Sequence, residues 1–151
     1  YLSDFYRDNL LVKPGGMKVE DVPLDLSHIR TPSYVQAGRE DHIAPPESVW
    51  KLTHHFAGPL RFVLASSGHI AGVVNPPSAN KYQYWTNDKP AHTLAEHIAG
   101  ATEHPGSWWP HWIEWLRDQA PRQVPATGKR APGGKGDKAI EDAPGTYVRT
   151  R

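Results

Sequence analysis

The sequence predicts an α/β fold, and the order of its most apolar segments is the main reason. Residues 33–38 and 60–65 are short runs of β-forming and apolar residues, each typical of a buried strand. Between them, residues 47–56 place four large apolar side chains at helical spacing: Val49, Trp50, Leu52 and Phe56. A strand, a helix and a strand in this order predict a parallel βαβ unit with a right-handed crossover.

Two further helices are expected after the second strand. Residues 94–102 predict a short helix, and residues 108–119 predict a longer one. The longer helix has three large apolar side chains on one face by helical spacing: Trp109, Trp112 and Leu116. We expect this face to pack on the sheet as core, in preference to forming a polyester-binding surface. Residues 85–88, Trp-Thr-Asn-Asp, are expected to form a loop.

Composition and charge exclude several function classes. The net charge of +1 does not favour nucleic acid or an anionic membrane as a partner, and no apolar run approaches the roughly 20 residues that span a bilayer. The sequence contains no cysteine, so it holds neither a disulfide nor a cysteine nucleophile. Its nine histidines include no HExxH pattern, and we expect no metal. The chain does not begin with Met and is expected to be a fragment of a cytoplasmic protein.

Two polar residues follow the two predicted parallel strands. Asp41 comes after residues 33–38, and His69 comes after residues 60–65. Open α/β sheets place their active sites at the carboxyl ends of their strands. In the α/β-hydrolase fold the catalytic residues occur along the chain as nucleophile, acid and histidine, so Asp41 and His69 match the last two. A carboxylate that holds one imidazole nitrogen prepares the other to act as a general base.

Less specific explanations exist for each of these residues. An Asp after a strand is commonly a turn or helix-cap residue, and a Gly-His pair is often only a turn. His42, next to Asp41, is more readily explained by a local hydrogen bond than by a role in catalysis. His54 and His55 lie on the predicted helix and are interpreted as part of a solvated face.

Longer motifs around these residues resemble class I polyhydroxyalkanoate synthases. The acid block is Gly-Arg-Glu-Asp-His-Ile-Ala-Pro at 38–45, and the histidine block is Ser-Gly-His-Ile-Ala-Gly-Val-Val-Asn-Pro-Pro at 67–77. Similar blocks are Trp-Thr-Asn-Asp at 85–88, Gly-Ser-Trp-Trp-Pro-His-Trp at 106–112 and Ala-Pro-Gly-Thr-Tyr-Val at 143–148. The resemblance covers nearly the whole chain, is weakest from 121 to 138, and indicates the C-terminal part of such an enzyme.

The resemblance implies a division of the chain into four parts. Residues 1–30 would be the exit from a cap region, and residues 31–120 the C-terminal part of an α/β-hydrolase catalytic domain. Residues 121–138, rich in Pro, Gly, Lys and Arg, are expected to be a flexible linker. Residues 139–151 would be a C-terminal docking tail.

The resemblance also implies an activity and the roles of two residues. The reaction would be acyl transfer from (R)-3-hydroxyacyl-coenzyme A to a growing polyester, with release of coenzyme A. Coenzyme A would enter as part of the substrate, and no cofactor is expected. Asp41 would be the acid member of the catalytic triad, either orienting His69 or acting more directly on the substrate hydroxyl. His69 would be the general base, and the nucleophile would be a cysteine upstream of this chain. We therefore expect the chain by itself to be inactive. The expected setting is the surface of polyhydroxyalkanoate granules in the cytoplasm, with a homodimer as the complete protein.

Two other functions remain open at this point. One is an esterase or depolymerase of the same fold, which an upstream serine in place of cysteine would favour. The other is a non-catalytic granule-binding module, in which His69 would have no part in activity.

Overall fold

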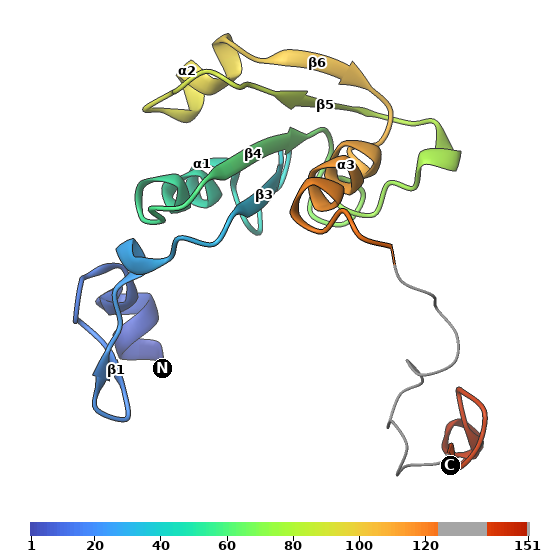
Figure 1. Cartoon of the computed structure of the whole chain (residues 1–151), viewed down its shortest axis with the longest axis horizontal. Coiled ribbons are helices and arrows are strands. Elements are labelled where there is room, and N and C mark those ends of the chain that lie inside the picture. Colours follow the sequence, from blue (N-terminus) through green and yellow to red (C-terminus); the bar gives the residue numbers. More distant parts are fainter. Residues whose placement is uncertain (124–138, 151) are drawn as a thin grey trace. The chain divides into compact units, whose positions relative to one another are not determined.

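The computed structural model describes residues 1–123 and 139–150. The chain divides into two compact units, of which the first runs from Tyr1 to Trp115 and the second begins at Leu116. The first unit contains the sheets (Figure 1). Both residues of the predicted catalytic pair fall within its bounds. Most of the predicted linker, from residue 124 to 138, lies outside the described residues.

A four-stranded mixed sheet organises the first unit. Its strands are β3 (Ser33–Gly38), β4 (Leu60–Ala65), β5 (Gln83–Thr86) and β6 (Thr102–Pro105), and they lie in that order. The β3 and β4 strands are parallel, whereas β5 and β6 are antiparallel to their neighbours. The connection from β3 to β4 contains α1 (Pro46–Trp50) and a 3-10 turn (Lys51–His54). The predicted parallel pair with a helix between its strands is confirmed.

The second half of the sheet corrects the sequence prediction. Residues 85–88 were expected to be loop, but Trp85 and Thr86 belong to β5. The β6 strand was not expected at all, and it includes Pro105 and is mostly exposed. Both strands have only four residues, and an exposed edge strand ending in proline carries no alternating apolar pattern to reveal it.

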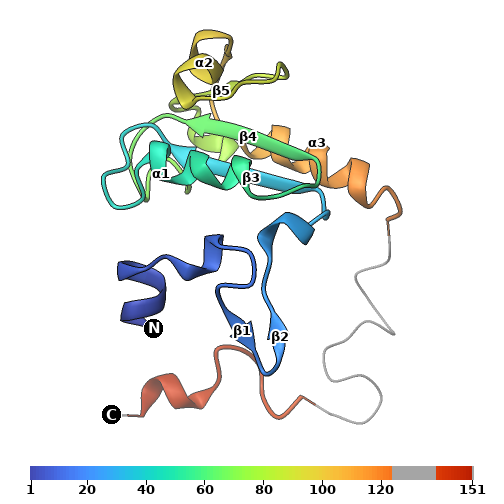
Figure 2. The same ribbon diagram turned by 90° about the vertical axis from the view of Figure 1, so that its left-hand side faces the viewer.

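The central strand β4 supplies core side chains to both faces of the sheet. Phe62 and Leu64 belong to one apolar cluster, and Val63 and Ala65 belong to the other. Successive side chains of a strand point to opposite faces, which explains this alternation. The α1 helix lies in front of the β3–β4 pair in Figure 2, and α3 (Trp109–Gln119) lies behind it. Each face of β4 is therefore covered by a different helix.

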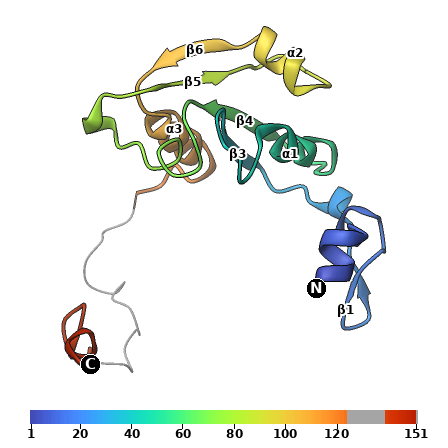
Figure 3. The same ribbon diagram turned by 180° about the vertical axis from the view of Figure 1, so that it is seen from behind.

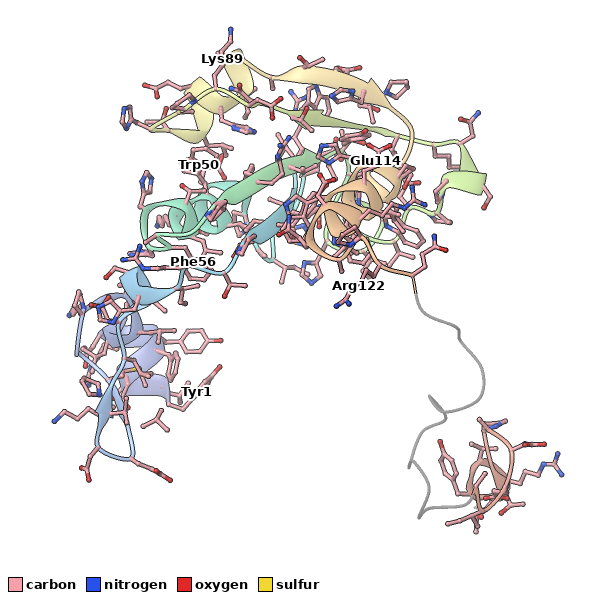
Figure 4. All side chains as sticks on the ribbon, viewed as in Figure 1. Tyr1, Trp50, Phe56, Lys89, Glu114 and Arg122 are labelled. Carbon is pink, nitrogen blue, oxygen red and sulfur yellow. The ribbon has the colours of Figure 1, made fainter. Side chains whose placement is uncertain are left out.

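The face that α1 covers is closed by aromatic packing. Trp50 is the last residue of α1, and its side chain points toward α2 (Leu94–Ala99), as Figure 4 shows. Its ring centroid is 4.9 Å from that of Phe62 and 5.0 Å from that of His97. Thr93 and Glu96 form a capping box at the start of α2, in which each side chain accepts a hydrogen bond from the other residue's backbone N–H. The cap fixes the helix that carries His97 into this cluster.

The side of α3 that meets the sheet agrees only in part with the predicted one. Trp109 packs against the cluster of Val63 and Ala65, as expected. The rings that contact Tyr34 of β3 are those of Trp108, His111 and Trp115, with centroid separations of 6.0, 5.7 and 5.5 Å. Trp112 and Leu116, which were expected to be buried, are 36% and 38% exposed. This segment has large apolar side chains on several sides, so spacing alone did not determine which side meets the sheet.

The remaining elements are short. The N-terminal part has a π-helical turn (Leu2–Arg7), 3-10 turns (Leu10–Val12 and Leu26–His28) and a hairpin of β1 (Lys18–Val19) and β2 (Val22–Pro23). A 3-10 turn follows β4 (Pro77–Ala79), and the second unit has another (Thr146–Arg149). The predicted docking of residues 139–151 stays a prediction. None of the helices in the described residues has the length and apolarity to cross a membrane.

Candidate active site

Asp41 lies in the loop that follows β3 and is 8% exposed. Its Oδ1 atom accepts hydrogen bonds from the backbone N–H groups of Ile43, at 2.8 Å, and Ala44, at 2.9 Å. The bond from Ala44 is the main cause that lowers the pKa of Asp41; burial opposes it, and the bond to His69 and that from Ile43 lower the pKa further. Asp41 is therefore an ionised acceptor at neutral pH.

His69 lies just beyond the end of β4, and its ring faces the second oxygen of Asp41. The distance from His69 Nδ1 to Asp41 Oδ2 is 2.8 Å. The side chain of His69 is 47% exposed, whereas that of Asp41 is 6% exposed. The structure thus brings together the two residues that the sequence predicted as a pair, with the carboxylate buried and the imidazole at the surface.

The hydrogen bond determines which imidazole nitrogen can take up a proton. An ionised carboxylate only accepts hydrogen bonds, so Nδ1 of His69 must carry the hydrogen that it shares with Asp41. In the neutral ring, Nε2 then has the lone pair. We find no hydrogen bond to Nε2 from any residue between 1 and 123 or between 139 and 150. The arrangement provides a proton acceptor held by a buried anion.

Backbone hydrogen bonds hold the two loops together past the ends of the strands. The parallel register ends with Gly38 opposite Ala65. The Arg39 N–H then donates to the Ala65 carbonyl at 2.8 Å, and the Glu40 N–H donates to the Ser67 carbonyl at 3.1 Å. A Cβ on Gly38 would lie 3.0 Å from the Ser67 carbonyl oxygen, so the absence of a side chain allows this close approach.

Comparison with known proteins finds relatives of this chain. The poly(3-hydroxyalkanoate) polymerase subunit of Cupriavidus necator is 46% identical over 154 residues, and the alignment covers 100% of this chain and 25% of that protein. The poly(3-hydroxyalkanoate) polymerase of Methylorubrum extorquens is 47% identical over 152 residues, and the alignment covers 100% of this chain and 24% of that protein. This chain is a relative of the poly(3-hydroxyalkanoate) polymerases. Its resemblance to polyhydroxyalkanoate synthases, inferred from the motifs, is thereby confirmed.

The chain spans about a quarter of the length of the polymerases that it matches. This share is consistent with the C-terminal part that the motifs indicate. A poly(3-hydroxyalkanoate) polymerase of Ectopseudomonas oleovorans is more distant, at 36% identity over 154 residues, with 99% of this chain and 26% of that protein covered. No family model matches the chain.

The other histidines singled out in the sequence are not part of the pair. His42 is exposed, and within the described residues it makes no hydrogen bond to Asp41 or His69. His54 is exposed as expected for a solvated face, but His55 is half-buried and lines an apolar cavity. Among the described residues, no three His, Cys, Asp or Glu side chains come together as metal ligands.

Two parts of the site were not found by sequence reasoning. The N–H groups of Ile43 and Ala44, which fix Asp41, are backbone groups, and only the tendency of Asp to bond the N–H two residues ahead pointed to them. The loops also carry apolar side chains that face solvent: Ile43 at 66%, Ile70 at 73%, Val73 at 40% and Val74 at 60% exposed. These side chains lie in the same two loops as the polar pair, and no periodic pattern in the sequence identifies them.

Proposed function

We propose that the complete protein is a class I polyhydroxyalkanoate synthase of the α/β-hydrolase fold and that this chain is its C-terminal part. The observation that carries the proposal is the 2.8 Å hydrogen bond between Asp41 Oδ2 and His69 Nδ1, formed just past the ends of two adjacent parallel strands. The names of the relatives support a polymerase in preference to another enzyme of this fold.

In the first half of the proposed reaction, His69 Nε2 takes the proton of a cysteine thiol that the rest of the protein supplies. The thiolate attacks the thioester carbonyl carbon of (R)-3-hydroxyacyl-coenzyme A. The bond from that carbon to the coenzyme A sulfur breaks, and the imidazolium returns the proton to the departing sulfur. Asp41 stabilises the imidazolium in between, because its ionised carboxylate faces Nδ1.

In the second half, His69 takes the proton of a 3-hydroxyl group. The hydroxyl oxygen attacks the acyl-cysteine, an ester bond forms, and the cysteine sulfur leaves and regains the proton. The chain grows by one unit without a net change in protonation. Asp41 acts through His69 in this account, since its Oδ1 is already occupied by the N–H groups of Ile43 and Ala44.

The setting of the enzyme is part of the same proposal. The substrate would be an (R)-3-hydroxyacyl-coenzyme A, and the product a polyester that remains attached at the surface of a cytoplasmic granule. The complete protein would act as a homodimer. The exposed apolar side chains beside the pair, among them Ile43 and Ile70, support contact with an apolar acyl chain or with the remaining part of the protein.

Product analysis of the complete protein tests this proposal. The protein is incubated with (R)-3-hydroxybutyryl-coenzyme A, and the release of coenzyme A, the insoluble polyester and the free hydroxy acid are each quantified. We expect one molecule of coenzyme A to be released for each monomer unit that is incorporated into the polyester. Free 3-hydroxybutyrate as the main product would contradict the proposal and indicate an esterase. Turnover of neither kind by a folded protein would contradict it as well and indicate a non-catalytic granule protein.

A further inference from the structure

His69 stands at the start of a tight turn that has little room to deform. Within this turn the Gly72 N–H donates to the Gly68 carbonyl at 2.9 Å, and the Val74 N–H donates to the Ile70 carbonyl at 2.8 Å. Gly72 is buried, and a Cβ there would lie 2.8 Å from the Gly68 carbonyl oxygen and 2.9 Å from that of Ser66. The backbone is therefore packed against itself directly after the histidine.

Two consecutive tryptophans hold the far end of this turn. The indole N–H of Trp108 donates to the Gly72 carbonyl at 3.0 Å, and that of Trp109 donates to the Val73 carbonyl at 3.0 Å. The donors lie 36 positions further along the chain, where α3 begins. Figure 3 shows α3 beside the loop that follows β4, as these bonds require. Two neighbouring carbonyls are thus fixed from outside the turn.

The tryptophans are themselves anchored to the strands that carry the catalytic pair. Trp108 is 9% exposed and belongs to the apolar cluster of Val63 and Ala65 on β4. Its ring is stacked on Tyr34 of β3, with centroids 6.0 Å apart. Because β3 leads to Asp41 and β4 leads to His69, the start of α3 ties the His69 turn to the framework of both residues.

We propose that Trp108 and Trp109 are positioning residues for His69 and that they act through their indole N–H groups. The inference rests on the function proposed for His69. The phenyl ring of a phenylalanine keeps most of the packing of an indole but cannot donate to a carbonyl. The Gly72 carbonyl would then lose its buried donor, the turn would relax, and His69 would lose its alignment with Asp41. A displacement of about 1 Å at a catalytic group can reduce turnover by roughly 100-fold.

The test uses the complete protein with Trp108→Phe, Trp109→Phe and the double substitution. Trp112→Phe is the matched control, because it lies on the same helix, is 36% exposed and makes no indole hydrogen bond within the described residues. We expect kcat of the double variant to fall roughly 10- to 100-fold with KM changed less than about twofold. The control should keep the kcat of the unsubstituted protein.

A spectroscopic measurement separates positioning from folding. The proton that His69 Nδ1 shares with Asp41 should give a proton resonance far downfield, assigned by its loss in His69→Gln. We expect this resonance to weaken or vanish in the Trp108→Phe and double variants and to persist in Trp112→Phe. Melting temperatures are recorded for all variants. A lower melting temperature with unchanged kcat and unchanged resonance would overturn the proposal, because the tryptophans would then serve stability alone.

The same experiment distinguishes the two proposals. If His69→Gln keeps full turnover, the function proposed for His69 is wrong, and the role of the tryptophans falls with it. If His69→Gln is inactive while the double tryptophan variant keeps the kcat and resonance of the unsubstituted protein, the positioning role alone is wrong. Trp109 is only partly buried, so Trp109→Phe provides a readout even if Trp108→Phe does not fold.

Discussion

Asp41 Oδ2 and His69 Nδ1 lie 2.8 Å apart although the two residues are 28 positions apart in the sequence. The parallel pairing of β3 and β4 brings the two residues together in space, because the carboxyl ends of both strands lie at the same edge of the sheet. The other oxygen of Asp41 is held by two backbone N–H groups, so the carboxylate is fixed at both ends. Asp41 therefore orients the His69 ring and also places a negative charge next to it.

Asp41→Asn tests the orientation. The asparagine oxygen can still accept from the N–H groups of Ile43 and Ala44, which would turn its NH2 group toward His69. His69 would then have to accept at Nδ1 and carry its hydrogen at Nε2, the wrong tautomer for a general base. We expect kcat of the complete protein to fall by about three to four orders of magnitude, as for other triads.

The control for this substitution is Asp25→Asn. Asp25 also accepts a backbone N–H, from Ser27 at 2.9 Å, but it caps a 3-10 turn that contains neither Asp41 nor His69. The control should keep most of the turnover. If Asp41→Asn also kept more than about a tenth of kcat, Asp41 would not set the tautomer of His69.

Gly72→Ala tests the packing of the His69 turn. The new Cβ would meet backbone oxygens of Gly68 and Ser66 at 2.8 and 2.9 Å, and these atoms cannot move without distorting the turn. We expect a loss of about 1–3 kcal/mol in the free energy of unfolding and a lower kcat. Gly68→Ala is the matched control in the same turn, because its Cβ would meet only the Glu40 carbonyl oxygen, at 3.6 Å. Thermal unfolding of both variants measures the difference, and equal losses would contradict the packing argument.

His97 predicts how stability depends on pH. The side chain is 3% exposed, and burial lowers its pKa, because the charged ring would be cut off from water. The unfolded chain therefore takes up a proton first, near the ordinary histidine pKa of about 6.5. The free energy of unfolding should fall as the pH drops below this value. The contribution of His97 to this fall should end once the pH is below the pKa of His97 in the folded state.

The measurement is the melting temperature between pH 8 and pH 5 for the unsubstituted protein and for His97→Leu. We expect the variant to show a smaller loss on acidification, because it removes the buried group that titrates. His54→Gln, at an exposed position, serves as the control and should leave the pH dependence unchanged. Identical pH profiles for His97→Leu and the unsubstituted protein would mean that a group other than His97 determines the pH dependence of the melting temperature.

The sequence was a good guide where one pattern had one structural solution. Residues 33–38 and 60–65 were predicted as strands with the bounds that the structure has, since compact runs of β-forming residues between turn residues have few alternatives. With both strands placed, a right-handed parallel crossover brings their carboxyl ends together, so Asp41 and His69 were predicted as neighbours. Topology and chain order alone predict the pair.

The failures came where tertiary contacts decide between equivalent patterns. The α3 segment has tryptophans on several sides, and the pairing of Trp108 and Trp115 with Tyr34 selects the buried face. The β5 strand is determined by its pairing with β4, and the sequence of a four-residue segment is too short to predict that pairing. The indole bonds to Gly72 and Val73 join segments 36 positions apart, and only the structure reveals them.

The most direct test of the central claim is the release of coenzyme A by the complete protein with His69→Gln, measured beside His42→Gln. Both substitutions replace a histidine in the loops at the strand ends, but of the two only His69 forms a hydrogen bond with the Asp41 side chain. We predict that His69→Gln lowers kcat by roughly 100- to 10,000-fold, the range expected for loss of a general base, while His42→Gln stays within about tenfold of the unsubstituted protein. Undiminished coenzyme A release by folded His69→Gln would contradict the account.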